Sequence, residues 1–149
     1  MQTLPLDATD QDFMDVVEEW VAILAQDRYQ EASEYLYHPP SSIWSPEQLA
    51  QTIANYGDAE PHWSGKTFHV VLSSADDLDD LPFDEEAVRR FDDAEPVDPE
   101  TGYRVVAEVL YAPLLDDGTG AVSSGLTAVV DFLDLGGYLA PMLVMFHVL

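Results

Sequence analysis

Residues 121–149 read AVSSGLTAVVDFLDLGGYLAPMLVMFHVL, two apolar runs on either side of the pair Gly136 and Gly137. Short runs rich in β-branched and aromatic residues, joined at a glycine turn, are typical of a β-hairpin. The second run is too short to cross a membrane as a helix, which takes roughly 20 apolar residues. We therefore predict a long hairpin at the centre of a sheet. Because proline cannot donate a backbone hydrogen bond, we expect a bulge near Ala140 and Pro141.

Two further strands are predicted upstream of this hairpin. Residues 67–74, TFHVVLSS, form a short run rich in β-branched and aromatic residues. Residues 103–115, YRVVAEVLYAPLL, alternate so that one face is apolar and the other is mixed. The apolar face would hold Tyr103, Val105, Ala107, Val109 and Tyr111, and the mixed face Arg104, Val106, Glu108 and Leu110. The segment DDGTG at 116–120 is predicted to be a turn.

The first 57 residues predict helices. Thr9 and Asp12 precede apolar residues at three- and four-residue spacing as far as Leu24, and a second apolar stripe ends before the prolines at 39 and 40. A third helix is expected after Ser45 as its cap, with Pro46 at its first position, Gln48 closing a capping box and Gly57 at its exit. Helices followed by antiparallel strands indicate one α+β domain over residues 1–149, with the helices packed on one sheet face.

The charge of the chain is strongly one-sided. Asp and Glu number 29 against five Lys and Arg, giving a net charge of -24, while 47% of the residues are hydrophobic. This composition fits a folded chain and disfavours direct binding to nucleic acid or to anionic membranes. The charge is densest at about 76–100, which we expect to be an acidic surface insertion, with FDEEAVRRF at 83–91 forming one or two helical turns.

Three explanations of this acidity are open: a solvated surface, adaptation to a salt-rich cytoplasm, or a surface that binds a basic protein partner. For the third, the binding residues would be Asp76, Asp77, Asp79, Asp80, Asp84, Glu85, Glu86, Asp92 and Asp93. The opening MQTLPLDATD lacks the features of a signal peptide, so a cytoplasmic location is expected.

Searches for catalytic and metal-binding motifs give no match. There is no G-x-S-x-G elbow, no phosphate-binding glycine loop, no EF-hand loop and no cysteine for a zinc site. We therefore expect no metal and no cofactor. The residues that a concave sheet would best gather in a pocket are Trp20, His69, Asp131 and His147, the last three as acid-base groups.

The segments DVVEEWVAILAQDRYQEASEYL at 15–36 and SPEQLAQTIANYG at 45–57 resemble the opening helices of NTF2-like, cystatin-type α+β proteins. The likeness includes an aromatic residue in the first helix and a D-x-Y break at Asp27 to Tyr29. It implies a curved antiparallel sheet of about four strands wrapped around a long helix, often in a homodimer, and enclosing a cone that is catalytic in some members and only binds in others. None of the family's catalytic residues carries over to this sequence.

The leading hypothesis is thus a non-catalytic acidic module that binds a basic protein, in the manner of an inhibitor or immunity-type protein. The alternative is an NTF2-like pocket that binds or isomerises a small apolar ligand. A third reading is mimicry of DNA by a negative surface, which requires carboxylates spaced like phosphates.

Overall fold

The computed structural model describes residues 1–40, 43–56, 67–71, 88–91, 96–116, 119, 122–123 and 126–148. Its helices are α1 (Asp10–Ala25), α2 (Tyr29–Tyr35) and α3 (Pro46–Ala54). Its strands are β1 (Leu4–Pro5), β2 (His69–Val71), β3 (Val88–Arg90), β4 (Arg104–Tyr111), β5 (Leu114–Asp116), β6 (Val122–Ser123), β7 (Leu126–Asp134) and β8 (Tyr138–Val148). The α+β class is therefore confirmed.

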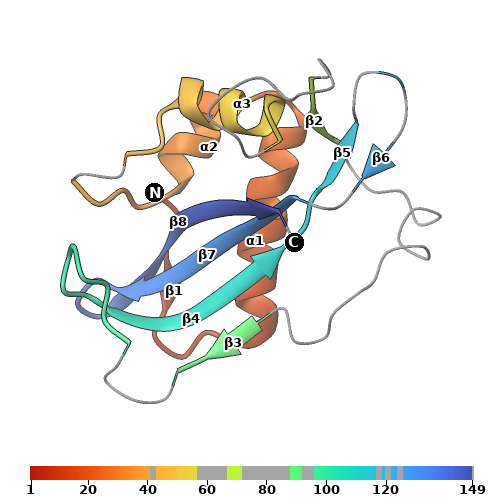
Figure 1. Ribbon diagram of the computed structural model, residues 1–149. Coiled ribbons are helices and arrows are strands. Elements are labelled where there is room, and N and C mark those ends of the chain that lie inside the picture. The colour runs from red at the N-terminus through yellow and green to blue at the C-terminus, as the bar shows by residue number, and fades with distance from the viewer. Residues whose placement is uncertain are drawn as a thin grey trace.

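The strands form two antiparallel sheets instead of one sheet of about four strands (Figure 1). The larger is curled, has the order β1-β8-β7-β4-β3 and is centred on the predicted hairpin, whereas β2, β5 and β6 make a separate sheet of three strands. Residues 103–115 were predicted to be one strand, but the chain leaves the larger sheet after Tyr111 and enters the smaller one at Leu114. The break contains Pro113, which cannot donate to a ladder.

The helices begin where the sequence predicts. The Thr9 hydroxyl accepts from the Asp12 amide at 3.2 Å, and the Asp12 carboxylate accepts from the Thr9 amide at 2.8 Å, a complete capping box. Ser45 caps α3 by accepting from the Gln48 amide at 3.1 Å. The D-x-Y break is a turn in which Asp27 has a φ of 57° and accepts a hydrogen bond from the Tyr29 hydroxyl.

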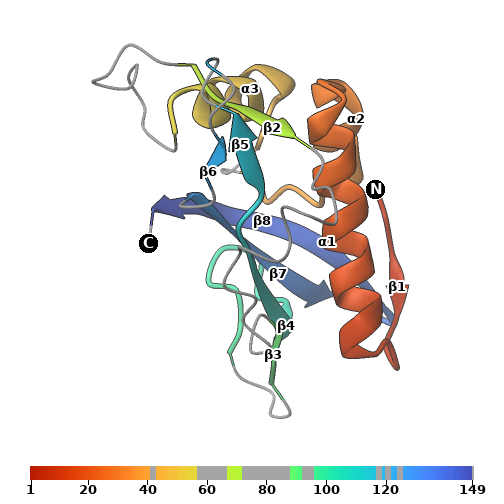
Figure 2. The ribbon, with the colours of Figure 1, turned by 90° about the vertical axis from the view of Figure 1, so that its right-hand side faces the viewer.

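Helix α1 lies against one face of the larger sheet, which we call the inner face (Figure 2). The rings of Phe13 and Phe132 meet there with centroids 4.7 Å apart, and Trp20 stacks on Phe146 at 6.2 Å. Phe13, Trp20 and Phe132 are at most 1% exposed. Burying large aromatic side chains contributes roughly 2–3 kcal/mol each, so this contact stabilises the packing of α1 on the sheet.

The opposite, outer face carries a second, smaller apolar cluster. Val105, Leu133 and Met142 are buried there beneath Tyr37 and Phe91. The predicted alternation placed Val105 with Ala107 and Val109, but the register shifts between Val105 and Ala107, so Val105 faces outward and Val106 joins the main core. A bulge reverses the faces because it adds one residue to a period of two.

Pro141 lies in a regular part of β8. It pairs with Phe132, and the bulge is instead at Val144, where the partners of Val129 and Val130 jump from Met145 to Leu143. The Pro141 carbonyl accepts from the Tyr37 amide at 2.7 Å, so the backbone polar groups of Pro141 face away from β7. No ladder hydrogen bond is lost, which explains why the predicted bulge at Ala140 and Pro141 is wrong.

The side of β8 that faces away from β7 is also covered at Leu143, two residues beyond Pro141. Trp44 Nε1–H donates to the Leu143 carbonyl at 3.0 Å, and the Trp44 ring meets Phe146 edge-on at 5.8 Å. The segment between α2 and α3 therefore closes this edge with two donors, the Tyr37 amide and the Trp44 indole.

The acidic insertion also departs from expectation. Val88, Arg89 and Arg90 were predicted to be helical, but they form β3 and pair with Val109, Glu108 and Ala107. The Phe91 amide continues this pairing by donating to the Val106 carbonyl at 2.9 Å. Cross-strand pairing outweighs the weak helical pattern here, since a two-turn helix would have little tertiary support. The remainder of 83–91 lies outside the described residues.

We predict that Phe132→Ala lowers the free energy of unfolding by about 3–5 kcal/mol, because it leaves a cavity against Phe13. Leu110→Ala, from the outer face where Leu110 is 41% exposed, is the matched control and should cost less than about 1 kcal/mol. Urea denaturation followed by fluorescence measures both. Equal losses in the two variants would show that the inner face is not the dominant core.

Candidate functional site

The nine carboxylates predicted to bind a basic partner lie outside the described residues: Asp76, Asp77, Asp79, Asp80, Asp84, Glu85, Glu86, Asp92 and Asp93. The described part of the predicted insertion, residues 88–91 and 96–100, lies at the edge of the larger sheet through β3 and the bridge between Val97 and Arg104. Other acidic groups are found among the described residues, on α1 and on the larger sheet.

Helix α1 carries a stripe of exposed carboxylates on the side away from the sheet: Asp15, Glu18 and Glu19, which we call the α1 stripe. Spacings of three and four residues bring these like charges together, an unfavourable arrangement on a helix. Partial burial, and then the charge of Asp15, raise the pKa of Glu18. Glu19 accepts at 3.1 Å from the Tyr35 hydroxyl, whose single proton is shared with the Val16 carbonyl, also at 3.1 Å.

Within the described part of the chain, the arginines are used elsewhere. Arg28 pairs with Glu31, and Arg90 donates to the Ala8 carbonyl at 3.0 Å and lies 3.3 Å from Asp10. Arg89 lies over the Phe91 ring, with its guanidinium carbon 5.0 Å from the ring centre. The α1 stripe therefore keeps its negative charge.

A different acidic feature lies on the outer face. Glu108 on β4 and Asp131 on β7 are cross-strand partners, and their side chains are hydrogen-bonded to each other. Asp131 Oδ1 is buried and has no hydrogen-bond partner. Desolvation by burial, followed by the charge and hydrogen bond of Glu108 and the charge of Asp98, raises the pKa of Asp131 to about 7. A raised pKa of this size keeps a substantial fraction of Asp131 protonated at neutral pH.

The four residues predicted to share a pocket do not come together. Trp20 is buried in the core and donates from Nε1 to the Ala32 carbonyl at 3.1 Å. His69 and His147 are exposed, and Asp131 points to the outer face, away from Trp20. They do not form the acid-base group that an enclosed cone requires.

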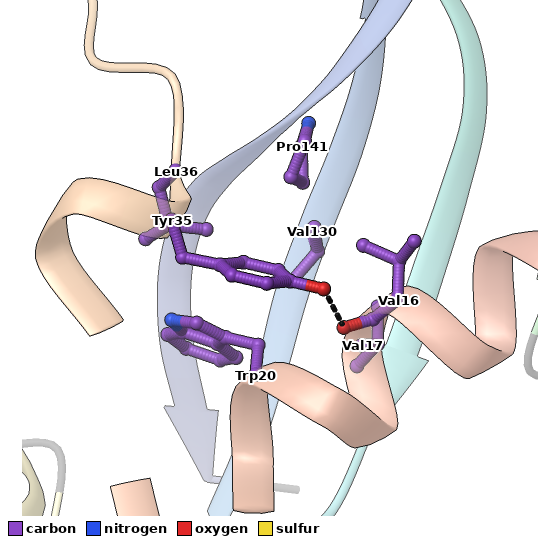
Figure 3. A pocket seen from close by; sticks show the side chains of 7 residues that line it. All are labelled: Val16, Val17, Trp20, Tyr35, Leu36, Val130 and Pro141. Carbon is purple, nitrogen blue, oxygen red and sulfur yellow. Dashed lines mark hydrogen bonds between the residues drawn. The ribbon is translucent and has the colours of Figure 1, made fainter. Parts of the chain in front are cut away.

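A pocket between α1 and the sheet is lined by seven side chains from α1, α2, β7 and β8 and the residue that follows α2 (Figure 3). The Tyr35 ring lies among Trp20, Val130 and Pro141, and its hydroxyl donates to the Val16 carbonyl at 3.1 Å. No volume for even a water molecule remains in this pocket. Tyr35 fills the pocket in which the cone of an NTF2-like protein would hold a ligand. This role of Tyr35 was not predicted from the sequence.

No protein-family model, curated protein or solved structure matches the chain. Among the described residues, no group of three or more His, Asp and Glu side chains is placed to hold a metal ion. In the same part of the chain, no helix has the length and apolar character needed to span a membrane.

Sequence reasoning singled out Asp131 but missed its partner. Glu108 was placed on the mixed face of its strand, which is correct. Its position opposite Asp131 depends on the register between β4 and β7, which includes a bulge. Alternation along each strand therefore predicts the face, and only the register identifies the pair.

We predict that Asp131→Asn flattens the dependence of stability on pH. The pKa of Asp131 is about 7 in the folded protein, against about 3.9 in an unfolded chain. The protonated carboxyl therefore contributes stability that is fully present below about pH 4 and is lost as the pH rises through 7. Between pH 5 and 8 the free energy of unfolding of the wild type should fall by about 1–2 kcal/mol more than that of the variant, allowing for partial solvent screening.

Urea denaturation at several pH values measures this difference. The matched control is Asp134→Asn on the same strand, since the amides of Gly136 and Gly137 lower the pKa of Asp134. The lowered pKa of Asp134 stabilises the folded state above about pH 4. The free energy of unfolding of the control should therefore lie below that of wild type by a constant amount from pH 5 to 8. Parallel curves for wild type and Asp131→Asn would contradict the raised pKa.

Proposed function

We propose that this protein is a non-catalytic acidic module that binds a basic surface of a partner protein. The observation that carries the proposal is the α1 stripe, in which Asp15, Glu18 and Glu19 project from one rigid helix without a neutralising arginine from the described residues. A fixed array of like charges accelerates association with an oppositely charged surface by roughly 10- to 1,000-fold. An inhibitor or immunity-type role is one form of this function.

The energetics of α1 favour this reading. Like charges at i, i+3 and i, i+4 cost a few tenths of a kcal/mol each, so a helix selected only for stability would alternate their signs. Here the repulsion is tolerated, and the Glu19 carboxylate accepts from the Tyr35 hydroxyl. A basic partner would relieve the repulsion on binding.

The acidic residues between 76 and 93 add to the negative charge of the chain, and their high density makes them the strongest contribution from the sequence. We also propose that the chain is a member of the NTF2-like α+β proteins. The curled antiparallel sheet with a long helix on its inner face supports that assignment (Figure 2). The filled space around Tyr35 favours binding at the surface over a ligand inside the cone.

We predict that neutralising the α1 stripe slows association with a basic probe. In the variant Asp15→Asn, Glu18→Gln, Glu19→Gln, the association rate of a fluorescent oligolysine peptide at low salt should fall roughly 3- to 10-fold. Gln retains an acceptor for Tyr35, so the fold should persist, and circular dichroism checks this. Stopped-flow fluorescence measures the rate. The difference should fade as salt shortens the Debye length to about 8 Å and below.

The matched control removes the same number of charges from exposed positions on other segments: Asp7→Asn, Glu34→Gln, Glu47→Gln. Its association rate should change by less than about twofold. If both variants slow association equally, the effect is one of net charge alone and the α1 stripe is not a binding surface.

A further inference from the structure

The outer face of the larger sheet presents two adjacent rows of side chains with different chemistry. Leu110, Val129 and Met145 are cross-strand neighbours and form an apolar row. Glu108 and Asp131 form the next row, which is acidic where β4 meets β7. Leu110 and Met145 are 41% and 47% exposed, unlike the side chains of the inner face. An apolar patch bordered by carboxylates is typical of an interaction surface.

The acidic row is incompletely satisfied. Asp131 Oδ1 itself is buried, but the side chains of Glu108 and Asp131 are both partly exposed, and the single bond between them leaves further acceptor positions on both groups. Arg89 is opposite Glu108 on β3, but its guanidinium lies over Phe91. A cation brought by another molecule would therefore complete this row.

We propose that the outer face binds an extended segment of a partner protein that carries an apolar side chain and an arginine two residues apart. The apolar side chain would rest on the row formed by Leu110, Val129 and Met145, and the guanidinium would sit against Glu108 and Asp131. Same-side residues of an extended chain are about 6.5–7 Å apart, the spacing of successive rows along a strand. A planar guanidinium suits two adjacent carboxylates better than the point charge of lysine.

This inference goes beyond the proposed function, because the α1 stripe and the outer face lie on opposite sides of the sheet (Figures 1 and 2). The two surfaces also differ in mechanism. The α1 stripe acts through a field over a distance, whereas the outer face requires direct contact and a defined strand direction. Either surface can therefore fail experimentally without affecting the other.

Binding at the outer face should release a proton. The guanidinium stabilises the ionised form of Asp131, so Asp131 releases its proton to solvent as the arginine docks. Other groups around Asp131 do not supply the missing cation. Those that titrate or carry charge on the elements packed nearby are Arg89 on β3, Glu108 on β4, Asp98 in the turn before β4, Tyr37 before the α3 segment and His147 on β8.

The experiment uses the full chain and a synthetic peptide with blocked termini. Its sequence repeats leucine, serine, arginine, serine, so that leucine and arginine lie on the same side of the extended chain. Because Asp131 has a pKa of about 7, it is roughly nine-tenths protonated at pH 6. Affinity should therefore rise about tenfold from pH 6 to pH 8. Calorimetry at pH 6 in buffers of different ionisation enthalpy should detect close to one proton released per peptide bound.

Three matched changes test the contacts. Replacing arginine by citrulline, its neutral counterpart, should weaken binding at pH 8 by more than about tenfold. Moving each arginine by one position, so that leucine and arginine point to opposite sides, should have a similar effect. Asp131→Asn should weaken binding at pH 8 and abolish the dependence on pH, whereas Leu110→Ser should weaken binding a few-fold and leave the proton release unchanged.

Each outcome decides the proposal. Proton-coupled binding that depends on Asp131 and on the peptide pattern supports it. Binding that is unaffected by Asp131→Asn or by the shifted pattern overturns it. If that binding is instead reduced by neutralising the α1 stripe, the proposed function stands while the outer-face site is rejected. Absence of peptide binding also overturns the outer-face site, and the oligolysine measurement then tests the proposed function separately.

Discussion

The alternation of side chains along β7 is the constraint on which the rest of the structure depends. The inner face of β7 packs against α1 through Ala128, Val130 and Phe132. The residues between and after them, Val129, Asp131 and Leu133, must therefore point outward. A shift of one residue would place a carboxylate against Phe13 and expose the core. The position of Asp131 on the outer face is therefore a direct consequence of how the protein packs its main helix.

The same constraint divides the electrostatics of the molecule into two parts. On α1, the stripe faces solvent, where repulsion between its charges is screened. On the outer face, partial burial beside Glu108 raises the pKa of Asp131. The described arginines stabilise local structure, as when Arg90 bonds to the Ala8 carbonyl, and leave both groups of carboxylates unbalanced. The chain thus offers two distinct kinds of negative surface.

Local signals in the sequence predicted local structure well. The caps at Thr9 and Ser45, the break at Asp27 and the glycine turn of the hairpin all appear as expected, since each depends on a few neighbouring residues. Errors occurred where long-range pairing decides the outcome. The strand at Val88–Arg90 exists because β4 is beside it, and Pro141 is accommodated because Tyr37, far away in sequence, lies at the edge of β8. The candidate site follows this pattern, because Asp131 could be selected from sequence but Glu108 could not be assigned to it.

The closed edge of β8 has a consequence for the behaviour of the protein in concentrated solution. Exposed strand edges recruit further strands and lead to fibrils, and an 11-residue apolar strand is a strong template. Here the Tyr37 amide and the Trp44 indole occupy the outward carbonyls of Pro141 and Leu143, so a second chain finds these acceptors taken. The short connection between two helices thereby removes two of the acceptors through which another strand could pair with this edge of β8.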